Sequence, residues 1–129
     1  FDVKQVYANK VMVNHHGGAI LAGGHIYGHS ESKGWTCQDF KTGKAVWQDK
    51  NKLDKGSVVF ADGMLYCRQE DGGGTIALIE ATPTGYKERS RFAQPDRSDK
   101  NSWAHPVLSD GRLYIRDQDV LLCFDVKKK

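Results

Sequence analysis

Gly63-Met64-Leu65-Tyr66 recurs twice in this chain, as Gly24-His25-Ile26-Tyr27 and as Gly111-Arg112-Leu113-Tyr114. The copies begin 39 and 48 residues apart, and a short apolar run precedes each one. Around every copy, alternating apolar and polar residues are separated by glycine turns, which is typical of hairpins rather than of helix pairs. The repeat therefore predicts an all-β fold.

The repeats predict where the strands lie. In the first unit we expect 18–22, 25–29, 34–40 and 44–49, in the second 57–61, 64–69, 74–80 and 86–93, and in the third 106–109, 112–116 and 120–126. The units themselves cover about 15–50, 56–94 and 103–127. Repeats of this length that consist of strands are typical of β-propeller blades. We predict a single domain over 1–129, a propeller segment of about three four-stranded antiparallel blades.

The third predicted blade lacks its outer strand. Residues 3–7 read as a lone strand with no blade of their own, and they are the candidate for this missing strand. The tetrapeptide Phe-Asp-Val-Lys occurs both at 1–4 and at 124–127, which is consistent with a repeat boundary. Because a closed propeller needs about four to eight blades, the ring is incomplete. The expected partners are the remaining blades of a longer propeller, or copies of the chain in a homo-oligomer in which strand 3–7 completes the last blade of the next copy.

Composition narrows the class of protein. The chain has 129 residues, of which 39% are hydrophobic, and no apolar run approaches the roughly 18 residues of a membrane span. The net charge of +3 is modest, and we interpret the terminal lysines 127–129 as a solvated tail, so no nucleic-acid partner is expected. The chain begins with Phe1 rather than Met, which we interpret as a processed or excised segment.

Three cysteines, Cys37, Cys67 and Cys123, are widely spaced and form no CxxC pair. This pattern argues against a disulfide framework and against a structural zinc site. All three fall within expected strands, so we predict that they are small buried apolar residues.

The segment from Cys37 to Trp47 contains a turn with an aromatic anchor. Thr42 and Gly43 turn the third strand into the fourth, since glycine tolerates a positive φ. Asp39 is placed to brace this turn through its carboxylate, and Trp47 offers a large ring for packing between adjacent blades. The third unit repeats the start of the pattern at Asp125, whereas the second has Ile79 in place of the aspartate and Phe92 in place of the tryptophan.

This segment resembles the tryptophan-docking motif of bacterial propeller-repeat proteins of the pyrroloquinoline-quinone type. The resemblance implies a periplasmic or exported protein, with pyrroloquinoline quinone and calcium as cofactors in the enzymatic members. The enzymatic members are dehydrogenases that hold the quinone against a disulfide between two adjacent cysteines. This sequence has no adjacent cysteines. Non-enzymatic relatives, including the bacterial outer-membrane assembly lipoprotein, use the motif only for architecture. We therefore predict a binding or interaction platform without catalysis, with part of a quinone-dependent alcohol or sugar dehydrogenase as the alternative.

Ligand-binding candidates come from loops that should share one edge of the blades. The loops entering each first strand and those joining second to third strands emerge on the same side, where ligand sites concentrate. The candidates there are His15, His16, His29, Trp103, His105 and Arg116. His16 and His105 are also candidate metal ligands, since neutral imidazoles bind transition metals. Trp103 offers a stacking surface for a sugar, aromatic or quinone ring. The competing interpretations are that the histidines brace loops and that Trp103 packs between blades.

Overall fold

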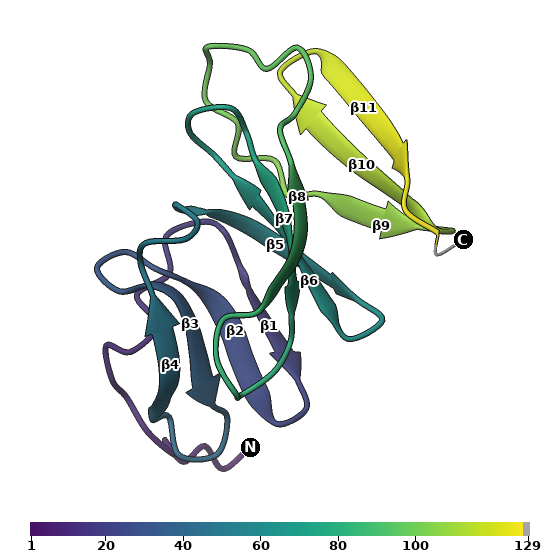
Figure 1. The fold of residues 1–129 in the computed structure, drawn as a ribbon. Coiled ribbons are helices and arrows are strands. Elements are labelled where there is room, and N and C mark those ends of the chain that lie inside the picture. Colours follow the sequence, from purple (N-terminus) through teal and green to yellow (C-terminus); the bar gives the residue numbers. More distant parts are fainter. Residues whose placement is uncertain (128–129) are drawn as a thin grey trace.

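The computed structural model describes residues 1–127, which form three antiparallel sheets and contain no helix (Figure 1). The first sheet is β1 (Ala19–Ala22), β2 (His25–Ser30), β3 (Gly34–Asp39) and β4 (Ala45–Asp49); the second is β5 (Gly56–Ala61), β6 (Met64–Gln69), β7 (Ile76–Glu80) and β8 (Glu88–Phe92); the third is β9 (Val107–Ser109), β10 (Arg112–Asp117) and β11 (Val120–Asp125). Neighbours in each sheet are also neighbours in the sequence. The all-β prediction is confirmed.

The repeated tetrapeptide begins at the hairpin turn that joins the first and second strands of each sheet. Asp62 and Gly63 have φ values of 51° and 75°, and Asp110 and Gly111 have 48° and 69°. Two consecutive left-handed residues match the twist of a tight hairpin, and aspartate followed by glycine is a favoured pair there. The turn fixes the register, with Ala61 opposite Met64 in the second sheet.

Successive side chains of a strand point to opposite faces, and the repeat uses both faces. The core between the first and second sheets contains Leu65 and Tyr27, together with Trp35, Cys37, Leu53, Val58, Cys67, Ala77 and Ile79. The core between the second and third sheets contains Ile76, Leu113 and Ile115, with Tyr66 packed against it. Leu65 therefore faces the preceding sheet and Tyr66 the following one. The second sheet lies between the other two, and the first strands β1, β5 and β9 contact in that order (Figure 1).

The segment from Cys37 to Trp47 forms a turn followed by an aromatic anchor. The Asp39 carboxylate accepts hydrogen bonds from the Thr42 amide (2.7 Å) and hydroxyl (2.8 Å), which lower the pKa of Asp39, and Gly43 has a φ of 71°. The Trp47 indole donates to the Thr82 carbonyl at 2.8 Å and lies edge-on against Tyr86, and both residues belong to the loop that joins β7 to β8 of the second sheet.

The corresponding positions elsewhere differ in detail. Phe92 of the second sheet packs against Phe124 of the third, with ring centroids 5.0 Å apart, so it also joins adjacent sheets. The Asp125 carboxylate accepts a hydrogen bond from the Lys127 amide at 3.0 Å.

The predicted strand at 3–7 is wrong, because residues 1–17 contain no strand. The Tyr7 hydroxyl instead donates to the Phe40 carbonyl (3.0 Å), and the Asn9 amide donates to the Gly43 carbonyl (2.8 Å). These contacts hold the segment against the β3–β4 turn of the first sheet. The third sheet lies on the other side of the second sheet, away from the first. Residues 3–7 therefore do not pair with β11 of the third sheet in the same chain.

The cysteine prediction holds for Cys37 and Cys67, which are fully buried, but is wrong for Cys123, which is exposed. Leu122 and Phe124 of β11 face the second sheet, so Cys123 between them points to the opposite face. No other sheet of the described chain covers that face. Within residues 1–127, no helix has the length and apolar character needed to cross a bilayer.

Candidate ligand-binding edge

Loops from all three sheets meet at one edge of the molecule, which we call the polar edge. Its members are His15 and His16 before β1, Glu31 after β2, Lys55 before β5, Glu70 after β6, and Trp103 and His105 before β9. The segments that supply these side chains are far apart in the sequence. Their meeting follows from the antiparallel order, which returns every second loop to the same side of a sheet.

Glu70 is the centre of the polar edge. Its side chain is only 8% exposed, and its two oxygens lie 2.9 Å from Lys55 Nζ and 3.0 Å from His16 Nε2. The contact with His16 is a close polar pair rather than an aligned hydrogen bond. The hydrogen bond to Glu70 raises the pKa of Lys55, whose ammonium also lies 3.8 Å from Glu31. Because a buried carboxylate is costly unless it is paired, these contacts fix the relative positions of three loops.

Three aromatic rings form a row across the polar edge. The His15 and His16 ring centroids are 4.5 Å apart, and those of His16 and Trp103 are 5.3 Å apart. The His105 Nε2 atom lies 2.7 Å from the His16 carbonyl oxygen, which joins the loop before β9 to the loop before β1. Trp103 remains 54% exposed. The row therefore presents an indole ring to solvent on a support made by other loops.

Arg68 is a buried side chain that binds the backbone of the loop that carries Trp103. This side chain of β6 is 1% exposed and donates hydrogen bonds to the carbonyls of Arg116 (2.9 Å) and Ala104 (3.3 Å) and to Gln94 Oε1 (2.6 Å). Burial lowers the pKa of Arg68, since the charged guanidinium loses hydration. The contact with Ala104 fixes the backbone next to Trp103.

Asp117 extends the buried network. Its carboxylate accepts hydrogen bonds from Gln94 (2.8 Å) and from the Ser98 amide (2.8 Å) and hydroxyl (2.6 Å), and it pairs with Arg97 at 3.2 Å. Burial alone would raise the pKa of Asp117, but these hydrogen bonds and the Arg97 charge outweigh burial and lower it to about 2. Arg97 also donates to the Glu70 carbonyl at 2.7 Å. The network thus runs from the third sheet back to the polar edge.

Two hollows open at the polar edge. One of about 300 Å³ is lined by His29, Glu31, Ser32, Gly34, Lys50, Asp54, Lys55 and Asp71. The other, of about 170 Å³, is lined by Asn101, Ser102, Trp103, Ala104, Arg116 and Gln118. Polar residues make up most of the lining of both, and charges of both signs line the hollow of about 300 Å³.

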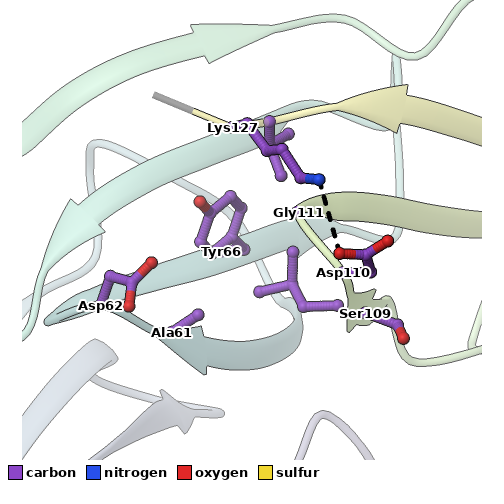
Figure 2. Close-up of a pocket in the computed structure, with 9 residues that line it drawn as sticks. Ala61, Asp62, Tyr66, Ser109, Asp110, Gly111 and Lys127 are labelled. Carbon is purple, nitrogen blue, oxygen red and sulfur yellow. Dashed lines mark hydrogen bonds and ion pairs between the residues drawn. The ribbon is translucent and has the colours of Figure 1, made fainter. Parts of the chain in front are cut away.

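A larger hollow of about 470 Å³ lies away from the polar edge, where the Asp62-Gly63 and Asp110-Gly111 turns approach each other. Figure 2 shows Tyr66 at its base and the Lys127 ammonium, 3.4 Å from Asp110, across its rim. None of the residues predicted for ligand binding lines this hollow.

The predicted ligand residues are only partly brought together. His15, His16, Trp103 and His105 meet, with His105 in the predicted loop-bracing position. Arg116 lines the smaller hollow with Trp103. His29 lines the 300 Å³ hollow of the polar edge instead, where it lies edge-on against Trp35, and burial lowers its pKa.

Sequence reasoning missed the importance of Glu70 and Lys55, and it gave Arg68 no role. The signal for Arg68 was available, because it continues the alternation of Met64 and Tyr66 toward the third sheet and so places a charge where an apolar residue is expected. Among residues 1–127, no three or more His, Cys, Asp or Glu side chains are arranged to hold a metal ion. His16 and His105 therefore have no third ligand of these types in the described chain.

No protein-family model matches the chain, and a search of curated proteins finds no match.

Proposed function

We propose that the chain is part of a β-propeller of the quinone-repeat type that binds a ligand at its polar edge, without catalysis of its own. The radial arrangement is supported by the chain order of the three sheets and by contacts between their first strands. It is also supported by Trp47 and Phe92, which join successive sheets. Under this proposal the protein works outside the bacterial cytoplasm, as the resembling proteins do.

The observation that carries the binding function is the contact between Trp103 and His16. These residues lie in loops that precede strands of different sheets, yet their rings lie 5.3 Å apart. Trp103 is exposed, whereas Glu70 and Arg68 beneath it are buried. An exposed indole on a polar, hydrogen-bonded base offers an apolar face to a ligand without reordering of the loop.

The chemistry of the edge favours a ring that carries polar substituents, such as a sugar. The Trp103 face provides stacking, and Arg116 and Gln118 in the adjoining hollow provide polar contacts. The 300 Å³ hollow of the polar edge adds the ammonium groups of Lys50 and Lys55. Pockets of this kind combine one apolar surface with a few fixed polar groups, which set orientation.

The test is an amide NMR titration of the chain with a panel of mono- and oligosaccharides. We expect shifts confined to the loops of the polar edge, and their loss in Trp103→Ala. Phe40→Ala is the matched control, because Phe40 is a comparably exposed aromatic residue at the β3–β4 turn, away from the edge. Absence of shifts across the panel would overturn the sugar assignment, and shifts that survive Trp103→Ala would overturn the site.

Pyrroloquinoline quinone with calcium belongs in the same titration. The chain with this cofactor is then tested for reduction of a dye in the presence of an alcohol or sugar. Reduction that is lost in His16→Ala would show that the protein is an oxidoreductase rather than a binding platform.

A further inference from the structure

The hollow of about 170 Å³ beside Trp103 carries one sign of charge. Among the described residues of its lining, Arg116 is the only charged one, and none is acidic. The 300 Å³ hollow of the polar edge differs, because three carboxylates and two ammonium groups line it. Of these two hollows, the one beside Trp103 is therefore the one that offers a positive group without a competing carboxylate.

Arg116 has N–H groups that are free to bind a ligand. Its side chain is exposed, and its Nε–H donates to the Gln118 carbonyl at 2.9 Å, which holds the guanidinium at the hollow. Within residues 1–127 the guanidinium makes no other hydrogen bond and no ion pair. Two N–H groups of a guanidinium match the two oxygens of a carboxylate in spacing and direction. Arg116 thus presents a carboxylate-binding group to the hollow.

A buried hydroxyl in the same lining also lacks a partner. Ser102 is 5% exposed, and its Oγ atom has no hydrogen-bond partner within residues 1–127. A buried donor without a partner destabilises a protein, and an acceptor oxygen of a ligand in the hollow would satisfy it. The orphaned hydroxyl is independent of the charge on Arg116, and both groups favour a ligand rich in acceptor oxygens.

The wall of this hollow is bound to a buried cation. Arg68 is 1% exposed and donates to the carbonyls of Ala104 and Arg116, two residues of the lining. These carbonyls accept from Arg68, so they are not turned toward a ligand as competing acceptors. The guanidinium of Arg68 also places a second positive charge next to the hollow.

The buried network around Arg68 has more positive than negative charge. Arg97 pairs with Asp117, whose carboxylate is the one negative group of this network in the described chain. Burial lowers the pKa of Arg68, and the nearby charge of Arg97 lowers it further. Glu70 does not restore the balance, because its charge is offset by Lys55 at 2.9 Å. Buried charges are screened less by salt than exposed ones, so the network favours an anion in the adjoining hollow.

We propose that the sugar bound at the polar edge is acidic: its ring stacks on Trp103, and its carboxylate, as in a uronic acid, binds Arg116 and Ser102. This inference rests on the proposed function and names the class of its ligand. The volume of about 170 Å³ is below the roughly 300–1,000 Å³ of pockets that enclose a whole drug-sized ligand. The hollow therefore takes a single acidic unit, and any further units of a longer chain lie outside it.

The test is an amide NMR titration of the whole chain at neutral pH with three ligands of the same ring: methyl glucuronide, its methyl ester, and methyl glucoside. The ester keeps the shape of the glucuronide and removes its charge. We expect the glucuronide to bind about tenfold more tightly than the other two, through charge-assisted hydrogen bonds. This advantage should fall as salt is added.

Variants locate the carboxylate. Arg116→Gln should bring the glucuronide down to the affinity of its ester. Arg89→Gln is the matched control, because Arg89 is an exposed arginine that pairs with Glu80 at the end of β7 away from the polar edge, and it should leave the advantage unchanged. Ser102→Ala should weaken the glucuronide several-fold without lowering thermal stability, since the hydroxyl has no partner in the free chain.

The outcomes separate this inference from the proposed function. Neutral and acidic sugars that bind with equal affinity overturn the acidic ligand and leave sugar binding at the polar edge in place. An advantage of the glucuronide that survives Arg116→Gln, or that is lost equally in Arg89→Gln, overturns the site. If none of the three ligands binds, the inference fails, and the wider sugar panel then decides the proposed function on its own.

Discussion

Arg68 of the second sheet donates a hydrogen bond to the backbone carbonyl of Arg116 in the third sheet, over 2.9 Å. Arg68 is almost completely buried, so its charge is offset by carbonyl and amide oxygens of the neighbouring sheet and loop rather than by water. The two sheets and the loop before β9 are therefore joined at one side chain. This contact couples the stability of the molecule to the position of Trp103.

Replacing Arg68 by Leu should destabilise the chain by about 3–5 kcal/mol, because three hydrogen bonds from a buried charged group are lost and their acceptors stay buried. Urea unfolding followed by circular dichroism measures the loss. Arg116→Ala is the control and should cost less than about 0.5 kcal/mol, since Arg68 binds only its backbone carbonyl and its exposed side chain donates one hydrogen bond, to the Gln118 carbonyl. Equal losses in the two variants would contradict the role of Arg68.

Asp117 should make stability depend on pH between about 2 and 4. Its carboxyl has a pKa of about 2 in the folded chain, against 3.8 for the unperturbed group. The folded state therefore binds fewer protons there, and the stabilisation is complete above pH 3.8 and lost as pH falls toward 2. We expect about 2 kcal/mol from this group.

The measurement for Asp117 is the difference in unfolding free energy between wild type and Asp117→Asn at several pH values. The difference isolates this carboxyl from other acidic groups, such as Asp39 and Glu88, whose pKa values are also lowered. It should shrink as the solution becomes more acidic. A difference that does not change with pH would show that Asp117 is not ionised against Arg97.

Truncation of Trp47 should destabilise the chain far more than truncation of Trp103. Trp47→Ala removes a ring that packs between two sheets, and large-to-small changes of this kind cost about 3–5 kcal/mol. Trp47→Phe keeps most of the ring and should cost about 1 kcal/mol through loss of the hydrogen bond to Thr82.

Trp103→Ala should change the unfolding free energy by less than about 1 kcal/mol, because the indole is mostly exposed. Thermal and urea unfolding of the three variants provide the comparison. A large loss for Trp103→Ala would make Trp103 a packing anchor and remove the reason for placing a ligand on it.

The hairpins were predictable from sequence because their determinants are local. A left-handed pair such as Asp62-Gly63 has few alternatives, and the alternation that follows it sets which residues face inward. The turn braced by Asp39 and the ring of Trp47 also depend on short spacings, and the Asp39 carboxylate accepts a hydrogen bond from the Thr42 amide. The segment 3–7 was misjudged because a strand also needs an edge to pair with, and Tyr7 instead donates a hydrogen bond to the Phe40 carbonyl just after β3.

The site was predictable only as a set of loops. Sheet order brings His16 and Trp103 to one side, and that much follows from counting strands. The sequence pattern did not predict the burial of Glu70, because its partners Lys55 and His16 come from two other segments. No regular spacing in the sequence indicates that these three residues meet. Exposure of Cys123 was missed for a related reason, since a strand pattern indicates a face but not whether another sheet covers it.

Substitution of Gly56 tests how closely the backbones of β5 and β6 approach each other near the polar edge. A methyl group on Gly56 would collide with the carbonyl of Arg68, and one on Gly17 would collide with the carbonyl of Gly56. Neither obstacle is a flexible side chain, so strands must separate to admit the methyl group. Gly56→Ala should therefore cost about 1–3 kcal/mol, as overpacking of a close contact does.

Gly73→Ala is the matched control for Gly56→Ala. Gly73 is exposed, has no positive φ, and has only the Ala93 methyl group as a neighbour, 4.0 Å from the added carbon. Its replacement should change stability by less than about 0.5 kcal/mol. Gly56→Ala should in addition weaken ligand binding in the NMR titration, because Lys55 is its neighbour in the chain and would move away from Glu70. A Gly56→Ala chain as stable as Gly73→Ala would mean that β5 and β6 are not packed as closely as described.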